Sequence, residues 1–316
     1  MKGLDAIVAA TDLSAGSKHA LDRAASLAQE HGAALTLVHV LASSAIDALR
    51  RWAGDAAAVQ AVEDEARSRL DEVADEARQR HALPIDARLV QGHAVQQVAQ
   101  LAHSRGADLV VTGTRGAGFV RAGLLGSTAE RIARRASQPV LMVRQMVHER
   151  YRRVLVPVDF SDWSLAAVHL ADRVAPRATL VLMHAVSVPM LGRMRLAGVG
   201  DATVAHYHDA ARAEARQQLY ALAERSGLPA QRLQLSTPQG DDPWVLIAEE
   251  EQARDCDLVV IGRQGRHALD ELLLGSTTRR VLAECSADVL VSVHHDDGAP
   301  PQQAARATAT RAGRPG

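Results

Sequence analysis

The sequence predicts an α/β protein built as two tandem doubly wound domains, each with a five-stranded parallel sheet covered by helices on both faces. Three observations predict this fold. The second half of the chain repeats landmarks of the first half, short apolar runs alternate with segments of helical spacing, and the apolar runs show no in-out alternation. Uninterrupted apolar strands are typical of parallel sheets, because both faces of such sheets are buried.

The repeat spans a whole domain rather than a short solenoid unit. Its landmarks keep their offset to within two residues, as Asp12 and Asp159, Gly92 and Gly240, and Gly113 and Gly262 show. We therefore expect one domain at 1–146 and another at 151–295, joined by the short polar stretch between them. The segment 296–316, rich in Pro, Gly, Gln and Ala, is expected to be a disordered tail.

Apolar runs place five strands in the first domain, at residues 5–10, 34–40, 85–90, 108–112 and 139–143. The segments between them have helical spacing, including a long amphipathic stretch at 55–80. Strands that alternate with helices form right-handed crossovers, and ligands of such sheets bind at the carboxyl ends of the strands, where the winding reverses. If the strand order is 3-2-1-4-5, Asp12 and Gly113 face one crevice at that point.

The composition favours a cytoplasmic globular protein with neither a nucleic-acid nor a membrane partner. The chain has 316 residues, a net charge of −1 and only 3% aromatic residues, so it lacks the basic excess and stacking side chains of a nucleic-acid binder. No apolar stretch reaches about 18 residues, and the N-terminus has no secretory pattern. Cys256 and Cys285 are too few for a disulfide framework, so we expect reduced thiols.

A repeated glycine motif predicts an anion site in each domain. Gly113-x2-Gly116-x9-Gly126-Ser127-Thr128 has the same spacing as Gly262-x2-Gly265-x9-Gly275-Ser276-Thr277. Glycines at a strand end allow positive φ and a close approach of ligand to backbone. A helix that begins after Gly126 offers N–H groups, hydroxyls and a positive dipole end to an anion. The alternative is a tight turn with a serine cap and no ligand. The motif is neither a Walker A loop nor a Rossmann fingerprint.

The chain resembles the ATP-binding class of universal stress proteins over nearly its whole length. The resemblance rests on the glycine motif, which follows an Asp-Leu-Val-Val strand and precedes a helix and a last apolar strand, and on the Asp after the first strand. It implies strand order 3-2-1-4-5, an adenine-nucleotide site for ATP with Mg²⁺ in each domain, and pairing of the two domains at their last strands. A further homodimer of whole chains stays open.

Residues that match the family motif carry the expected nucleotide contacts. The resemblance places Asp12 near the ribose or adenine with Ala10 and Thr11 lining the crevice, Val40 at the adenine, Gly113, Arg115 and Gly116 around the phosphates or ribose, and Gly126, Ser127 and Thr128 at the phosphates. The second-domain counterparts are Pro157, Val158, Asp159, Ala185, Gly262, Gln264, Gly265, Gly275, Ser276 and Thr277. No residue is assigned a catalytic or metal-ligating role.

The two copies differ in ways that bear on ligand affinity. The first loop carries Arg115 and Arg121 without an acid, whereas the second carries Arg263, Arg266 and His267 together with Asp270 and Glu271. Negative charge near a triphosphate weakens binding, so we hypothesise that the first site binds ATP at least as tightly as the second. His39 and His184 also recur, and we interpret them as hydrogen-bonded structural histidines.

Three functions remain open. The first is a non-catalytic or slowly hydrolysing ATP-binding regulator of the stress response, in which ATP biases conformation or assembly toward an unknown downstream protein partner. The second is an ATPase or nucleotidyl-transfer enzyme on the same fold, which needs a positioned base or metal carboxylate near the phosphates. Asp12 and Asp159 are the only repeated acids there. The third is a ligand-free interaction scaffold, against which the intact phosphate motifs count.

Overall fold

The computed structural model describes residues 3–53, 56–114, 126–187, 200–264 and 274–293. The expected tail at 296–316 lies outside these residues, as do Arg115, Gly116 and Gly265 of the predicted sites. The charged loop residues Arg121, Arg266, His267, Asp270 and Glu271 are outside them as well.

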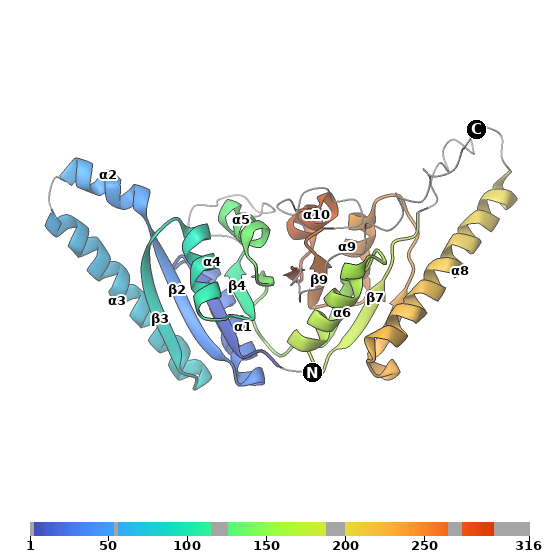
Figure 1. Cartoon of the computed structure of the whole chain (residues 1–316), viewed down its shortest axis with the longest axis horizontal. Coiled ribbons are helices and arrows are strands. Elements are labelled where there is room, and N and C mark those ends of the chain that lie inside the picture. The colour runs from blue at the N-terminus through green and yellow to red at the C-terminus, as the bar shows by residue number, and fades with distance from the viewer. Residues whose placement is uncertain (1–2, 54–55, 115–125, 188–199, 265–273, 294–316) are drawn as a thin grey trace, which may run out of the picture.

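The first half of the chain alternates strands and helices as predicted (Figure 1). Its elements are β1 (Ala6–Thr11), α1 (Ala15–His31), β2 (Ala34–Ala42), α2 (Ser43–Ala53), α3 (Ala56–His81), β3 (Ile85–Gly92), α4 (Ala94–Ser104), β4 (Leu109–Gly113), α5 (Ser127–Arg135) and β5 (Val140–Val143). All five predicted strands form, and α3 covers the predicted amphipathic stretch. Helix α2 was not predicted, although Ile46 on it is buried.

The second half repeats this order with its own elements. They are β6 (Arg153–Pro157), α6 (Asp162–Val174), β7 (Thr179–Met183), α8 (Asp201–Ser226), a short 3-10 helix η1 (Ala230–Arg232), β8 (Leu233–Ser236), α9 (Pro243–Ala253), β9 (Leu258–Gly262), α10 (Ser276–Glu284) and β10 (Asp288–Ser292). In the described part of the chain, no helix is both long and apolar enough to cross a membrane.

All ten strands join in one sheet of order β3-β2-β1-β4-β5-β10-β9-β6-β7-β8. Each half therefore has the predicted order 3-2-1-4-5, and the neighbouring strands within a half run parallel. The two halves meet where β5 pairs antiparallel with β10, with Leu141 opposite Leu290. The two five-stranded sheets are thus continuous, and they are paired through the last strand of each half.

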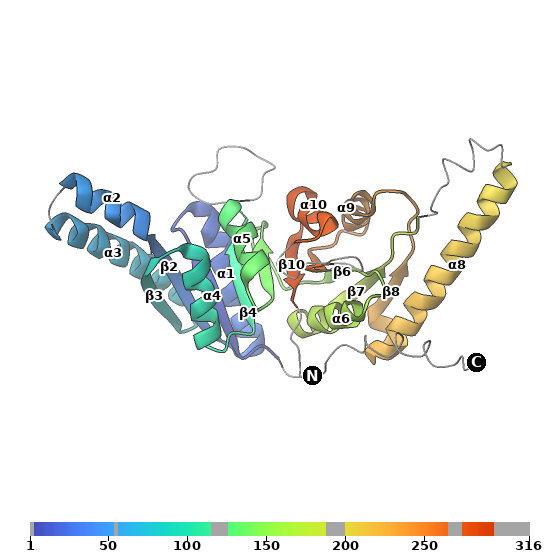
Figure 2. The ribbon, with the colours of Figure 1, turned by 45° about the horizontal axis from the view of Figure 1, so that its top comes forward.

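Helices cover both faces of the sheet and bury two apolar cores (Figure 2). Helices α1, α3, α6 and α8 contribute to one core, and α4, α5, α9 and α10 contribute to the other. Along β1, Ile7 and Ala9 enter the first core while Val8 enters the second. This two-sided burial explains why the strands read as continuous apolar runs.

A buried ion pair joins the two halves. Arg23 of α1 places Nε 3.3 Å from Oδ2 of Asp288, the first residue of β10, and both side chains are almost fully buried. Tyr151 donates its hydroxyl to the same oxygen at 2.7 Å, and the Arg23 guanidinium lies 4.1 Å from the centre of the Tyr151 ring. Burial, followed by the neighbouring Asp288 carboxylate, raises the pKa of Tyr151 well above its ordinary value. The tyrosine is therefore a neutral hydrogen-bond donor.

The stretch between the halves also takes part in this contact. The backbone N–H groups of Arg144 and Gln145 donate to Oδ1 of Asp288 at 2.7 and 3.1 Å. Arg23 in turn donates to the carbonyl of Glu149 at 2.9 Å. The polar segment predicted as a linker is thus hydrogen-bonded on both sides, which fixes the path of the chain between the halves.

Candidate functional site

Two cavities open at the carboxyl ends of the strands, one in each half. The first has a volume of about 460 Å³ and lies at the ends of β1, β2 and β4. The second has a volume of about 630 Å³ and lies at the ends of β6, β7 and β9. Both volumes are in the range of small-molecule sites. They lie where the winding of each sheet reverses, as predicted.

Every predicted site residue in the described part of the chain lines one of these cavities. The first cavity is lined by Ala10, Thr11, Asp12, Val40, Gly113, Gly126, Ser127 and Thr128. The second is lined by Pro157, Val158, Asp159, Ala185, Gly262, Gln264, Gly275, Ser276 and Thr277. Residues far apart in sequence come together because β1 pairs with β4, with Ala10 beside Thr112.

The anion end of each cavity is the start of a helix. Gly126 is the N-cap of α5 and Gly275 is the N-cap of α10, and no side chain caps either helix within the described residues. The Gly126 N–H donates to the Thr114 carbonyl at 2.8 Å, and the Gly275 N–H donates to the Arg263 carbonyl at 3.0 Å. These bonds hold the helix start at the strand end. The first-turn N–H groups, which have no partner within a helix, therefore lie at the cavity.

Positive φ is not the reason for glycine at these positions. Gly126 has φ −63° and Gly275 has φ −57°, values that any residue adopts. At Gly262 a Cβ would lie only 3.1 Å from the backbone oxygen of Gln264, so the constraint is space. Gly262, the strand-end glycine among these three, does not have the positive φ that a glycine there allows. The close approach of a ligand to the backbone stays a prediction.

Asp12 and Asp159 each build a tight turn at the end of the first strand. Oδ1 of Asp12 accepts from the N–H of Ser14 at 3.1 Å and from its hydroxyl at 2.6 Å. Oδ1 of Asp159 accepts the same pair of bonds from Ser161, at 3.0 and 2.6 Å. These serines are the N-caps of α1 and α6. The repeated aspartates therefore position the helix start as well as lining the cavity.

The residue inside each turn has left-handed backbone geometry. Leu13 has φ 63° and Phe160 has φ 60°, and such values cost a bulky residue about 1–3 kcal/mol. The aspartate–serine bonds on either side offset this strain. The strain thus recurs at the same point of both copies. Sequence reasoning missed it, because neither a leucine nor a phenylalanine signals positive φ.

The two copies differ in how the aspartate is held. In the first, the Thr11 hydroxyl lies 2.8 Å from the hydroxyl of the buried Ser17. In the second, Val158 has no hydroxyl, and the Ser164 hydroxyl donates to Oδ1 of Asp159 at 3.1 Å. That donor adds to the two from Ser161. The Ser164 hydroxyl thus contacts the aspartate of the second copy, whereas its counterpart Ser17 contacts Thr11.

The repeated histidines are hydrogen-bonded, as predicted. Nδ1 of His39 lies 2.9 Å from the Thr11 carbonyl, and Nδ1 of His184 lies 2.8 Å from the Val158 carbonyl. A carbonyl only accepts, so Nδ1 carries the proton in both rings. Each histidine ties the end of the second strand of its half to the first strand. His184 also stacks on Phe160, with ring centres 4.3 Å apart.

The second cavity is the wider of the two, and Pro157 accounts for part of the difference. The β1–β4 ladder extends to Ala10 and Thr112, whereas the β6–β9 ladder ends at Leu155 and Val259. Pro157 stands where the first copy has Ala10 and has no N–H for the ladder. The two strands therefore separate earlier, at the cavity floor.

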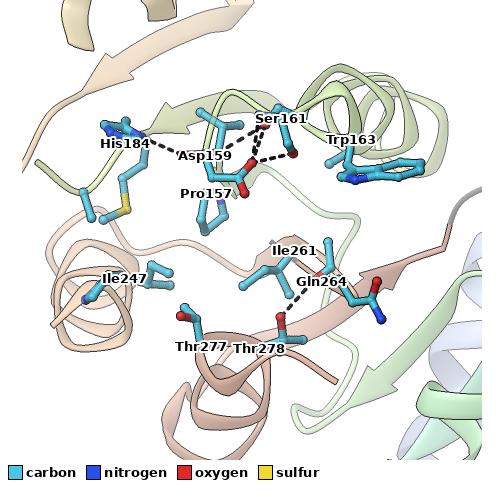
Figure 3. A pocket seen from close by; sticks show the side chains of 18 of the residues that line it. Pro157, Asp159, Ser161, Trp163, His184, Ile247, Ile261, Gln264, Thr277 and Thr278 are labelled. Atoms are coloured by element: carbon cyan, nitrogen blue, oxygen red, sulfur yellow. Dashed lines mark hydrogen bonds between the residues drawn. The ribbon is translucent and has the colours of Figure 1, made fainter. Parts of the chain in front are cut away.

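Opposite walls of the second cavity come from different elements (Figure 3). Pro157, Asp159 and His184 lie on one wall, and Thr277 and Thr278 lie on the other. Trp163, 40% exposed, lines this cavity where the first copy has a glycine. Its indole is a natural spectroscopic reporter of the second site alone.

Each cavity combines an apolar part with a polar end. Val38, Val40, Val98 and Ile132 line the first, and Met183, Ile247 and Ile261 line the second. One carboxylate, Asp12 or Asp159, stands among the described lining residues of each cavity. Among the described side chains, no three of His, Cys, Asp or Glu gather in a way that could hold a metal ion. The arrangement suits a ligand with a planar apolar ring and an anionic tail.

The side chain of Arg263 contacts the other half of the chain. Its guanidinium donates to the carbonyls of Arg134 at 3.4 Å and Ala136 at 3.1 Å, at the end of α5 in the other half. It is therefore directed into the junction between the halves. The physical reason is that unpaired carbonyls at a helix C-terminus attract a cation.

Comparison with known proteins gives consistent matches. A model described as the universal stress protein family matches residues 3–144 and 150–294. A universal stress protein of Mycolicibacterium smegmatis is 29% identical over 301 residues, which cover 90% of this chain and 96% of that protein. One of Thermus aquaticus is 35% identical over 139 residues, 44% of this chain and 97% of that protein. The crystal structure of a universal stress protein from Archaeoglobus fulgidus superposes with a TM-score of 0.64 at 19% identity, covering 90% of this chain and 97% of its own.

Proposed function

This chain belongs to the universal stress protein family, and on that premise we propose that it binds ATP in both cavities and acts as a nucleotide-dependent regulator of the stress response. The observation that carries the proposal is the repeated cavity in which a helix start without a side-chain cap meets an apolar slot. In this proposal ATP is hydrolysed slowly or not at all, and its binding biases conformation or assembly.

Different residues of each cavity would bind different parts of the ligand, according to the chemistry of each part. The backbone and hydroxyls of Ser127 and Thr128, at the start of α5, suit the phosphates, because N–H donors and the helix dipole favour negative charge there. Asp12 suits a ribose hydroxyl, which can donate to a carboxylate oxygen. Valines of β2 suit the face of the adenine. Ser276, Thr277 and Asp159 would take the same parts in the second cavity.

Mg²⁺ would enter with the triphosphate and neutralise part of its charge. It prefers oxygen ligands and is often held by substrate phosphates together with water. The hydroxyls of Ser127 and Thr128, and of Ser276 and Thr277, are the oxygen donors beside the proposed phosphate position. This donor set fits an ion that arrives with its ligand.

The hydrogen bonds of the two repeated aspartates favour a regulator over an enzyme. Asp12 and Asp159 each direct Oδ1 to the serine that caps the next helix. Both carboxylates thus build the turn before the helix, whereas an ATPase needs a base or a metal carboxylate positioned at the phosphates. We further propose domains at 1–146 and 151–295, a cytoplasmic location and a downstream protein partner.

The nucleotide content of freshly purified protein tests the proposal. The protein is denatured, and the supernatant is separated by ion-exchange chromatography against ATP, ADP and AMP standards. About two ATP per chain would support two working sites with little turnover. Mostly ADP would favour the ATPase. An empty protein that also ignores added ATP in calorimetry would refute the proposal and favour a scaffold.

A further inference from the structure

The two proposed phosphate-binding helices are each held at the far end by an arginine of the other half. Arg263 follows β9 and donates to the carbonyls of Arg134 and Ala136 at the end of α5, at 3.4 and 3.1 Å. Arg144 follows β5 and donates to the carbonyl of Leu282 in the last turn of α10. Each contact places a cation at the negative end of a helix dipole. Helices α5 and α10 lie on either side of the junction (Figures 1 and 2).

Arg263 also holds the opposite end of the second helix. Its carbonyl accepts the N–H of Gly275, the N-cap of α10, at 3.0 Å, and its own N–H donates to Ser292 of β10 at 2.9 Å. Its neighbour Gln264 lines the second cavity. One residue thus contacts the C-terminus of α5 through its side chain and the start of α10 through its backbone.

The equivalent residue of the first half lacks this double role. Thr114 accepts the N–H of Gly126 at 2.8 Å, as Arg263 does for Gly275. Its side chain is short and buried, so it has no group that can span the distance to the other half. The path between the two sites therefore runs through Arg263 and has no counterpart at Thr114.

From this geometry we infer that Arg263 is a positioning residue that couples the two nucleotide sites. The inference rests on the proposed function. Phosphates at the start of α5 hold that helix and, with it, the Arg134 and Ala136 carbonyls. These carbonyls fix the Arg263 side chain, and the Arg263 backbone fixes the N-cap of α10. A filled first site therefore prepares the second, and by thermodynamic linkage a filled second site favours the first equally.

A matched set of variants tests the coupling. Gly126→Leu closes the first site with an apolar side chain where phosphates would bind, and it adds no carboxylate that could hold the start of α5 as a phosphate does. The affinity of the second site for ATP is then followed by Trp163 fluorescence, with and without this substitution. We expect the substitution to weaken the second site at least about 5-fold, the lower end of typical coupling. In an Arg263→Met background we expect the dissociation constant of the second site to be about the same with and without the Gly126 substitution, so that the ratio of the two constants is about one.

Arg144→Met is the control, because it removes an arginine of the same kind from a helix end without touching either N-cap. It should keep the wild-type ratio. Arg263→Lys keeps the charge but loses the planar guanidinium, and should give a ratio between those of the wild type and Arg263→Met. This graded result would distinguish a loss of the arginine contact from a general disturbance of the junction by methionine. A ratio of one in the wild type, or an unchanged ratio in Arg263→Met, overturns the coupling alone. If the second site binds no ATP in the wild type or in any of the variants, the proposed function is refuted as well.

Discussion

Replacing Gly275 by aspartate is expected to weaken ATP binding at the second site while the protein stays folded. The backbone at this position, φ −57° and ψ 151°, suits any residue. An added Cβ would find its nearest neighbours at 3.6–3.8 Å, which is ordinary contact. Aspartate is a preferred N-cap, so its carboxylate would accept the first-turn N–H groups of α10 and occupy the place proposed for phosphate.

The expected loss follows from the charge of the new carboxylate. Two unit charges about 4 Å apart repel by about 1 kcal/mol in a water-like medium and by about 4 kcal/mol at the effective dielectric constant of a protein surface. The dissociation constant should therefore rise by roughly 5-fold to 10³-fold. The nucleotide-free variant should melt no lower than the wild type, because the cap and the helix dipole stabilise it by a few tenths to about 1 kcal/mol.

Isothermal titration with ATP measures the effect, and Gly275→Asn is the matched control. Asparagine is an equally good N-cap of nearly the same shape but carries no charge. The aspartate variant should bind ATP at the second site roughly 5-fold to 10³-fold more weakly than the wild type, and the asparagine variant should bind it more tightly than the aspartate variant does. Equal affinity of both variants and the wild type at the second site, with normal melting, would refute the assignment of phosphate to the start of α10.

Other parts of the structure give three further predictions. Arg23→Met leaves Asp288 buried without its cation, so the free energy of unfolding in urea should fall by about 3–5 kcal/mol; a loss below about 1 kcal/mol would contradict the buried pair. Burial raises the pKa of both the Cys256 and Cys285 thiols to about 12, so iodoacetamide should label them near neutral pH only after unfolding. Because unfolded thiols ionise first, stability should also fall as the pH rises above about 9. ATP should change the fluorescence of Trp163, and a signal that survives in Trp163→Phe would argue against this reporter.

The sequence predicted the strands well because they depend on burial, whereas their order came from the family resemblance. Buried parallel strands need continuous apolar residues, and that pattern is visible in one copy and repeated in the other. Helix α2 escaped notice although six of its eleven residues are apolar, because the helix is short and Ile46 is its only buried residue among those whose burial is described. Short helices of this kind are stabilised by packing against their surroundings rather than by their own sequence.

The cavity residues were predictable for a different reason from the contacts around them. Spaced glycines, hydroxyls and an aspartate after a strand carry chemistry that can be read directly, as at Asp12 and Gly126. The strained turns at Leu13 and Phe160 carry no such pattern. Arg263 bonds backbone carbonyls of a distant helix, and carbonyls are present at every residue, so nothing in the sequence selects its partners.

Pairing of β5 with β10 inside one chain makes the association of the halves independent of dilution. Separate chains would part as they are diluted, whereas a short connection holds the partners at an effective concentration of about millimolar or more. Each half is always paired with the other, different half, so matching positions can diverge. Pro139 precedes β5, whereas Asp288, with its buried ion pair, is the first residue of β10. The sheet edges left for a second chain are β3 and β8. The two duplicated domains thus form a permanent pair within one chain, in which each half can diverge in sequence while it stays bound to the other.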